Sequence, residues 1–172
     1  KNHNSLGVDI TAQAAAVMDK DSGAILWQKN ADQVRSLASI TKLMTALVFL
    51  ENNPGWNTEI TLEKRDEANS NAPNILRGET VTVKDLFYTS LIASDNNTAN
   101  ALVRSTGLDR NEFVGLMNKK AVNLGLDNTK FKDTTGLNQS NKSTALEILK
   151  LANTAFANQD IVEVTALKEY NF

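Results

Sequence analysis

Hydrophobic positions in the first third of the chain predict one strongly apolar helix. Its apolar side chains recur at spacings of three and four residues, the period of one helical face. They are Ile40, Leu43, Met44, Leu47 and Val48. The polar run 52–55 ends the helix, because its proline lacks the N–H group that a helix interior requires. We expect this helix to be central in the fold and largely buried.

Pairs of polar residues three positions apart predict the starts of three further helices, since such pairs bond reciprocally to the free N–H groups of a first turn. The pairs are Thr82 with Asp85, Asp109 with Glu112, and Thr144 with Glu147. The first helix is apolar over 83–91, the second over 113–124, and the third continues to about Ala157. The polar run 94–97 interrupts the first pattern, which resumes over 98–103.

Two short apolar segments, 14–18 and 24–27, flank the polar turn 19–23, and this pattern predicts an antiparallel hairpin. Residues 56–78 alternate short apolar and polar pieces, which is typical of loops and minor strands. The segments together predict an α+β fold, with a helical cluster against an antiparallel sheet. We find no linker that would divide residues 1–172 into two domains.

Composition and charge narrow the possible functions. The 172 residues are 41% hydrophobic and 22% charged, as in ordinary globular proteins. A net charge of −2 argues against a nucleic-acid partner, since nucleic-acid binders usually carry a basic excess. The absence of cysteine excludes thiolate catalysis and disulfides, and His3 is the only histidine. A Ser-His-Asp triad or a two-histidine metal site therefore lacks its residues, and we expect no metal or other cofactor.

Ser39 and Lys42 stand at the start of the apolar helix, where residues three apart lie on the same side. The partial positive charge of a helix start favours a serine alkoxide, and burial disfavours a charged lysine. For Lys42 to act as a base near neutrality, its pKa must fall about three units from the ordinary ~10.4. The alternative is structural: Ser39 caps the helix, and Lys42 extends along the surface to solvent.

The segment Ala93-Ser94-Asp95-Asn96 adds a second polar group between two predicted helices. Such a break places small polar side chains on a rigid support. The Ser94 hydroxyl could relay a proton between Lys42 and a leaving amine, and Asn96 could orient Lys42 and bind a substrate amide. The structural alternative is that this segment only caps the helix that begins near Thr98.

In these motifs the chain resembles the active-site serine penicillin-recognising enzymes, which carry Ser-x-x-Lys, Ser-Asp-Asn and Lys-Thr-Gly. It is most similar to the low-molecular-mass D-alanyl-D-alanine carboxypeptidases. The matching segments are Val17-Met18-Asp19, Ser22-Gly23, the stretch from Arg35 to Ala46, the stretch from Leu91 to Asn97, Leu124-Gly125-Leu126, the stretch from Phe131 to Leu137, and Ser143-Thr144-Ala145.

The resemblance implies that Ser39 is an acylated nucleophile, that Lys42 is its base, and that Ser94 and Asn96 form the second motif. It implies a β-lactamase/transpeptidase-like fold and an extracytoplasmic protein without a cofactor. The implied reaction is D,D-carboxypeptidase cleavage of peptidoglycan stem peptides that end in D-Ala-D-Ala. The resemblance also implies acylation by β-lactam antibiotics.

One departure from the family pattern is the absence of Lys-Thr-Gly from all 172 residues. Thr134-Thr135-Gly136 does not replace it, because this segment belongs to the family's separate Asp-x-Thr-Gly-Leu turn. The family's third motif lies on a later strand, so we expect a domain incomplete at its C-terminal end. A companion chain or segment would complete the sheet, since a hairpin alone is marginal in water.

Three alternatives stay open at this point. A D,D-endopeptidase would use the same site, and a non-catalytic wall-binding fragment would account for the absent third motif. A class A β-lactamase shares the first two motifs but carries Glu-x-x-x-Asn after the second. Between residues 98 and 136 the only glutamate is Glu112, and Leu116 stands where the asparagine would be.

Overall fold

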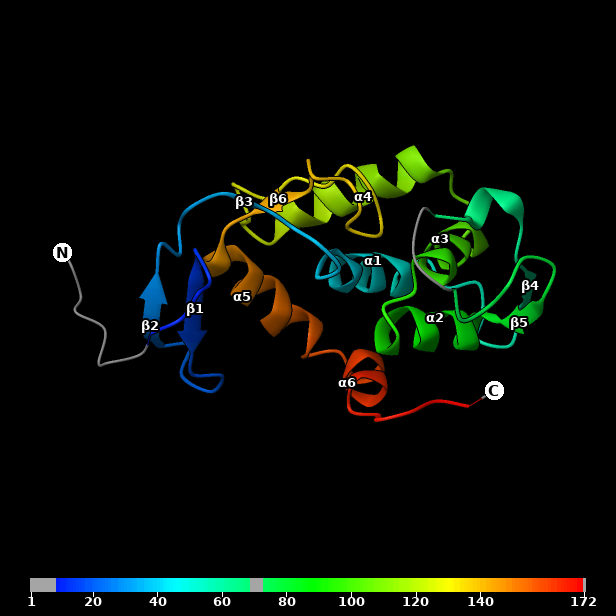
Figure 1. The fold of residues 1–172 in the computed structure, drawn as a ribbon, viewed down its shortest axis with the longest axis horizontal. Helices are drawn as coiled ribbons and strands as arrows, with labels where there is room; N and C mark the ends of the chain where they lie inside the picture. The colour runs from blue at the N-terminus through cyan, green and yellow to red at the C-terminus, as the bar shows by residue number, and fades with distance from the viewer. Residues whose placement is uncertain (1–8, 69–72, 172) are drawn as a thin grey trace.

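The computed structural model describes residues 9–68 and 73–171, so His3 lies outside the described residues. The chain is made of helices and short strands (Figure 1). The elements are β1 (Ala15–Met18), β2 (Ile25–Lys29), β3 (Arg35–Ser36), α1 (Thr41–Leu50), β4 (Glu59–Thr61), η1 (Lys64–Asp66), β5 (Thr80–Thr82), α2 (Val83–Ile92), α3 (Asn96–Ser105), α4 (Arg110–Asn123), β6 (Lys142–Ser143), α5 (Ala145–Ala155) and α6 (Gln159–Thr165).

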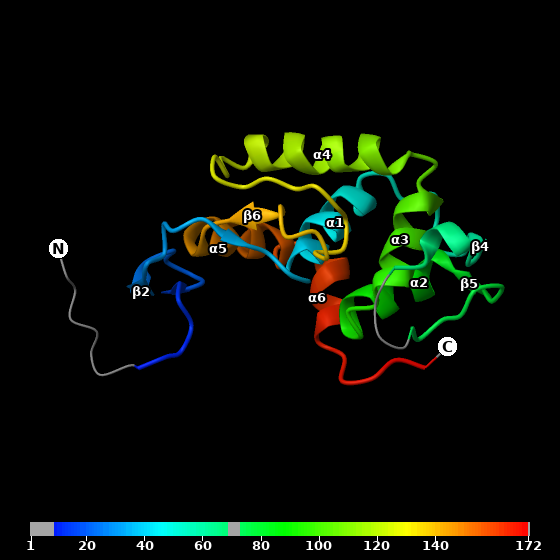
Figure 2. The same cartoon turned by 45° about the horizontal axis from the view of Figure 1, so that its top comes forward.

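Helix α1 is the centre of the fold, as its apolar pattern predicts. Every residue from Thr41 to Phe49 is buried, and α2, α3, α4 and α5 all contact the helix. Figure 2 shows α1 beneath α4, with α2 and α3 to one side and α5 to the other. Phe49 packs against Phe87 and Trp56 at ring-centroid distances of 5.6 and 5.9 Å. Burial on all sides fixes the position of the residues at the start of α1.

Two of the three predicted capping boxes form as expected. The Thr82 hydroxyl accepts from the Asp85 N–H while the Asp85 carboxylate accepts from the Thr82 N–H, and Asp109 and Glu112 bond in the same reciprocal way. The third pair differs. Thr144 caps α5, but the Glu147 carboxylate turns away and accepts hydrogen bonds from Asn128 and Thr129.

The structure also corrects some helix boundaries. Helix α3 begins at Asn96 rather than near Thr98, because the Asp95 side chain accepts the Thr98 N–H and caps the helix two residues earlier. Helix α5 ends at Ala155, and α6 follows it as a separate helix that the sequence pattern did not predict. The signal for α6 is Asn158, whose side-chain oxygen accepts the N–H groups of Asp160 and Ile161.

The predicted hairpin forms from β1 and β2, which pair antiparallel with an irregularity between Val17 and Met18. It lies beside α5 at one end of the molecule, while the β4–β5 pair lies at the other end (Figure 1). Strands β3 and β6, which were not predicted, pair near α1. Helices with small antiparallel sheets confirm the α+β fold class. Over the described ranges, none of the helices is long and apolar enough to cross a membrane.

Candidate active site

The Lys42 amine lies at the meeting point of three segments that are far apart in the sequence. The side chain leaves the first turn of α1 and is only 3% exposed. Its Nζ atom reaches the segment before α1, the start of α3 and the loop after α4. The contacts are Ser39 Oγ at 3.3 Å, Ser94 Oγ at 3.3 Å, Asn96 Oδ1 at 2.7 Å and the Thr135 carbonyl oxygen at 3.1 Å. The structure thus brings together all four residues that the sequence singled out.

The structural alternative for Ser39 and Lys42 is wrong. The N-cap of α1 is Ile40, which makes no side-chain capping bond, so the Ser39 hydroxyl does not cap the helix. Lys42 does not extend to solvent, since its amine is enclosed by four hydrogen-bond partners. Ser39 itself is exposed, as is Ser94. A buried amine therefore lies beneath two hydroxyl groups that a ligand from solvent can reach.

The surroundings of Lys42 tune its protonation. Burial lowers the pKa of Lys42 to about 8, and the negative charges of Asp95 and Asp133 oppose this change. The pKa of Lys42 thus moves in the direction that a base near neutrality requires, although these two carboxylates favour the ammonium form. With a pKa of about 8, about a tenth of the protein carries neutral Lys42 at pH 7. The amine can therefore accept a proton at a pH close to neutrality.

The segment between α2 and α3 holds a strained residue at the site. Ser94 has a φ of 55°, in the left-handed region that side-chain-bearing residues rarely adopt. The next residue, Asp95, caps α3, and its carboxylate also accepts the Asn74 N–H. Helix α3 therefore begins at Asn96 with its side chain directed at Lys42. Strain of this kind persists where the surrounding structure fixes it, often at functional sites.

The Thr135 carbonyl is the site group that sequence reasoning missed. Thr134-Thr135-Gly136 was set aside because it is not the third motif, yet its backbone contacts Lys42. The residue that could have revealed this contact in the sequence is Gly136. Its φ is 93°, and a Cβ atom added there would lie 2.1 Å from the Ala38 carbonyl oxygen. Only glycine permits this approach to the segment that carries Ser39.

A cavity of about 250 Å³ opens beside the cluster. Ser39, Lys42 and Ser94 form its polar side. The remaining lining is largely apolar and includes Leu91, Ala152 and Phe156. A small apolar group attached to a polar chain would fit such a recess, with its polar atoms at the mouth.

The α+β fold and the serine–lysine cluster, joined by a second serine and an asparagine, define the penicillin-recognising serine enzymes as the class. The chain belongs to the D-alanyl-D-alanine carboxypeptidase family, because the Peptidase S11 family model with that description matches residues 1–172. This family membership confirms the resemblance found in the motifs.

Relatives and solved structures agree with the family. The chain is 35% identical over 158 residues to a D-alanyl-D-alanine endopeptidase of Haemophilus influenzae, covering 91% of this chain and 54% of that protein. It is 34% identical to a D-alanyl-D-alanine carboxypeptidase of a Streptomyces species, covering 94% and 60%. A D-alanyl-D-alanine carboxypeptidase structure from Mycobacterium tuberculosis superposes with a TM-score of 0.84 at 30% identity, covering 93% and 61%. The chain thus spans a little over half the length of these relatives.

Proposed function

We propose that this protein is a serine D,D-carboxypeptidase that cleaves the terminal D-Ala-D-Ala bond of peptidoglycan stem peptides. The observation that carries the proposal is the position of the Lys42 amine, within 3.3 Å of the hydroxyl groups of both Ser39 and Ser94. A buried lysine with a lowered pKa can replace the histidine that serine hydrolases commonly use as base. Family membership supplies the substrate class.

The first half of the reaction forms an ester. Ser39 Oγ attacks the carbonyl carbon of the penultimate D-alanine, and neutral Lys42 accepts the hydroxyl proton. Lys42 then returns a proton through the Ser94 hydroxyl to the nitrogen of the terminal D-alanine. The C–N bond breaks, free D-alanine leaves, and the remaining peptide stays on Ser39 as an acyl ester.

The second half releases the shortened peptide. A water molecule attacks the ester carbon, and Lys42 accepts a proton from this water. The C–O bond to Ser39 breaks, and the proton returns to Ser39 Oγ, so the enzyme is regenerated. The Asn96 side chain keeps Lys42 in place through its oxygen, and its amide nitrogen can donate a hydrogen bond to the substrate.

A β-lactam would enter the same pathway. Ser39 would open the lactam by breaking its C–N bond, and the nitrogen would remain attached to the acyl group. Because this leaving group does not depart, it can obstruct the water that would hydrolyse the ester. The acyl-enzyme is then long-lived, which makes labelled penicillin a direct probe of Ser39.

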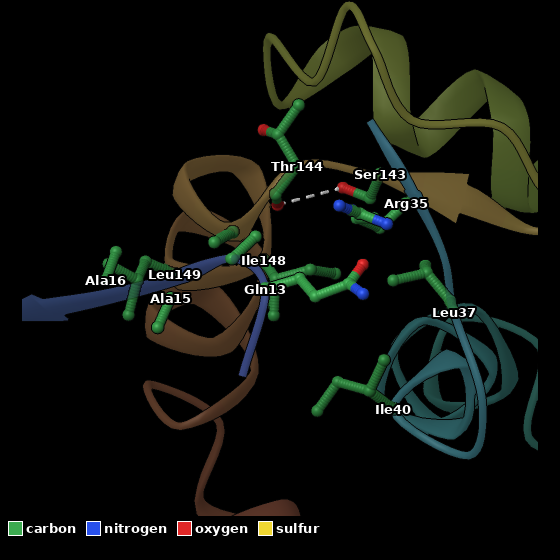
Figure 3. A pocket seen from close by; sticks show the side chains of 12 residues that line it. Gln13, Ala15, Ala16, Arg35, Leu37, Ile40, Ser143, Thr144, Ile148 and Leu149 are labelled. Atoms are coloured by element: carbon green, nitrogen blue, oxygen red, sulfur yellow. Dashed lines mark hydrogen bonds between the residues drawn. The ribbon is translucent and has the colours of Figure 1, made fainter. Parts of the chain in front are cut away.

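We also infer that a further segment, in this chain or in a companion chain, packs beside the hairpin. Within the described residues β1 and β2 pair only with each other. A groove of about 470 Å³ lies between β1 and α5, and Ala15, Ile148 and Leu149 line it (Figure 3). Leu37 and Ile40 line the same groove. Because Ile40 adjoins Ser39, a segment filling the groove would come close to the nucleophile.

That segment is where we expect the Lys-Thr-Gly motif and a hydrogen-bond donor for the oxyanion. Losing one oxyanion donor lowers a rate by about 100- to 1000-fold. The 172 residues alone should therefore react slowly. Because the proposed substrate is a cell-wall peptide, we expect the working enzyme to act outside the cytoplasmic membrane.

The names of the relatives favour a second candidate, because several are called D-alanyl-D-alanine endopeptidases. A pentapeptide ending in D-Ala-D-Ala and a cross-linked muropeptide dimer separate the two activities. Release of D-alanine from the first supports the carboxypeptidase, and conversion of the dimer to monomers supports the endopeptidase. The Ser39→Ala variant should be inactive on both. If neither substrate reacts and penicillin does not label the protein, a non-catalytic wall-binding role replaces the proposal.

A further inference from the structure

The Asp133 carboxylate organises the loop that follows α4. It accepts five hydrogen bonds, all from within residues 135–141. The donors are Thr135 N at 3.3 Å, Thr135 Oγ1 at 3.1 Å, Gly136 N at 2.8 Å, Asn138 N at 2.9 Å and Asn141 Nδ2 at 2.6 Å. These bonds close the loop around one negative charge. The conformation of Thr135 therefore depends directly on Asp133.

The same loop is bound to the start of α1 on several sides. Asn141, which is fully buried, donates to Thr41 Oγ1 at 3.1 Å. The Thr45 hydroxyl donates to the Thr134 carbonyl at 2.7 Å, and Gly136 packs against Ala38. The loop is thus fixed relative to both Ser39 and Lys42. A change in its shape must move one of them.

Two of the four hydrogen-bond partners of Lys42 can only accept, and this number equals the N–H donors of a neutral amine. A neutral lysine has two N–H donors and one lone pair. Asn96 Oδ1 and the Thr135 carbonyl can only accept hydrogen bonds, and they occupy the two donors. The lone pair is then left for a hydroxyl, either that of Ser39 or that of Ser94. Without the Thr135 carbonyl, the amine could rotate and direct its lone pair elsewhere.

We propose that Asp133 is a positioning residue: it fixes the Thr135 carbonyl so that neutral Lys42 presents its lone pair to the Ser39 hydroxyl. This inference rests on the proposed function of Ser39 and Lys42. Asp133 acts through Thr135 and touches neither the substrate nor the reacting atoms. Its role as a positioning residue therefore concerns the orientation of the base, and its negative charge separately favours the ammonium form of Lys42.

Two carboxylates influence the charge of Lys42. Asp95, the cap of α3, and Asp133 each favour the ammonium form. Burial alone would raise the pKa of Asp133, but the N–H groups of Gly136 and Asn138, together with Asn141 and Thr135, hold it below its usual value. Asp133 is therefore charged at neutral pH, and removing its charge should lower the pKa of Lys42.

Asp133→Asn is a sharp test because it keeps the size of the side chain and changes only its hydrogen bonding. An asparagine has one oxygen, so its NH₂ group must face donors that now bond to a carboxylate oxygen. The donors at Oδ1 of Asp133 include the Gly136 N–H, and the donors at Oδ2 include the Asn138 N–H. Either orientation sets two donors against each other, so we expect the loop to stay folded but to shift the Thr135 carbonyl. Asp127→Asn, at an exposed position on the preceding turn, makes the same charge change as a control.

The first measurement is the pH titration of Lys42, which is monitored by NMR of protein labelled with ¹³C at the lysine ε-carbon. The Lys42 signal is assigned by its absence from the Lys42→Arg variant. We expect a pKa of about 8 in the wild type and in Asp127→Asn. In Asp133→Asn it should be about one pH unit lower. A merely structural role predicts the opposite change, because a disordered loop would admit water and return the pKa toward its ordinary value. An unchanged or raised pKa would therefore overturn the proposal.

The second measurement is the rate of Ser39 acylation by labelled penicillin as a function of pH. At high pH every Lys42 is neutral, so the limiting rate reports its orientation alone. We expect Asp133→Asn to lower this limiting rate at saturating penicillin by about tenfold or more. The concentration giving half the limiting rate should change little. A normal limiting rate would contradict positioning even if the pKa of Lys42 moved.

Thr135→Val provides an independent variant if Asp133→Asn fails to fold. It removes the hydrogen bond to Asp133 and a longer one, of 3.4 Å, from the Leu137 N–H, and it keeps the side-chain volume and the charge. We expect the same loss in the limiting rate, smaller in size, with Lys42 titrating as in the wild type. An unchanged limiting rate in this variant would overturn the proposal. If the wild type itself is not acylated, the proposed function fails, while the Lys42 titration still tests the influence of Asp133.

Discussion

The Lys42 amine lies 2.7 Å from the Asn96 side-chain oxygen, although 54 residues separate the two in the sequence. This bond joins the first turn of the buried helix α1 to the first residue of α3. Both helices are fixed by packing, so the amine has little freedom to move away. The geometry of the cluster is thus a consequence of the fold as well as of the motif residues.

Replacing Asn96 by aspartate should change the pH dependence of acylation. In the wild type the rate should rise with pH through about 8, because only neutral Lys42 can accept the Ser39 proton. An aspartate at this position would stabilise the ammonium and raise the pKa of Lys42 by about one unit or more. The acid limb of the profile should therefore move to higher pH. Asn96→Ala, which adds no charge, is the control, and superimposable profiles for Asn96→Asp and the wild type would refute the role of Lys42 as base.

Ser94 permits a separation of stability from function. Alanine at this position retains the left-handed strain, whereas glycine relieves it. We expect Ser94→Gly to unfold with a free energy about 1 kcal/mol higher than that of Ser94→Ala in urea. Both variants lack the hydroxyl that relays the proton, so both should acylate about 100-fold more slowly than the wild type. Normal acylation by either variant would remove Ser94 from the proposed relay.

Gly136→Ala should damage the site through the backbone. The new Cβ atom would meet the Ala38 carbonyl oxygen at 2.1 Å, and either the loop or the Ser39 segment must shift. Gly107→Ala is a matched control, since Gly107 also has a positive φ of 80° but no atom within 4 Å of an added Cβ. Gly107→Ala should cost about 1 kcal/mol of unfolding free energy and leave acylation intact. Gly136→Ala should lose acylation, and equal rates for the two variants would show that the close approach is unimportant.

The sequence was a good guide to helices that are both amphipathic and capped. Helices α2 and α4 lie where the pattern placed them, since their apolar period and their capping residues point to the same boundaries. Helix α1 has no side-chain cap, and it was found from its apolar period and the polar run that ends it. Helix α6 was missed because its seven residues are too few for a periodic pattern to stand out. The two-residue strands β3 and β6 depend on pairing across more than 100 residues, which no local pattern reveals.

The site was predicted as far as side chains could reveal it. Ser39, Lys42, Ser94 and Asn96 were singled out because their residue types can carry the proposed chemistry, and the structure brings the four side chains together. The Thr135 contribution is a backbone carbonyl, and every residue has one, so its type gives no signal. The sequence also did not reveal that the Asp133 charge opposes the lowering of the Lys42 pKa, because Asp133 comes near Lys42 only through the folding of a loop.

The inferred companion segment can be tested by supplying it. Alone, the 172 residues should be acylated slowly by penicillin, because we expect the inferred segment to carry one donor to the oxyanion. Adding a peptide or protein fragment from a relative that carries the Lys-Thr-Gly strand should increase the rate. A fragment with the lysine of that motif replaced by alanine is the control. If the 172 residues alone react as fast as a full-length carboxypeptidase of the family, the companion segment is unnecessary.

The most direct test of the account is the identity of the acylated residue. After incubation with penicillin and digestion with trypsin, cleavage after Arg35 and Lys42 yields the peptide of residues 36–42, which contains Ser36, Ser39 and Thr41. Tandem mass spectrometry should place the penicilloyl group on Ser39. It should be absent from Ser39→Ala and retained in Ser36→Ala. A penicilloyl group on another residue, or its persistence in Ser39→Ala, would contradict the assignment of Ser39 as nucleophile.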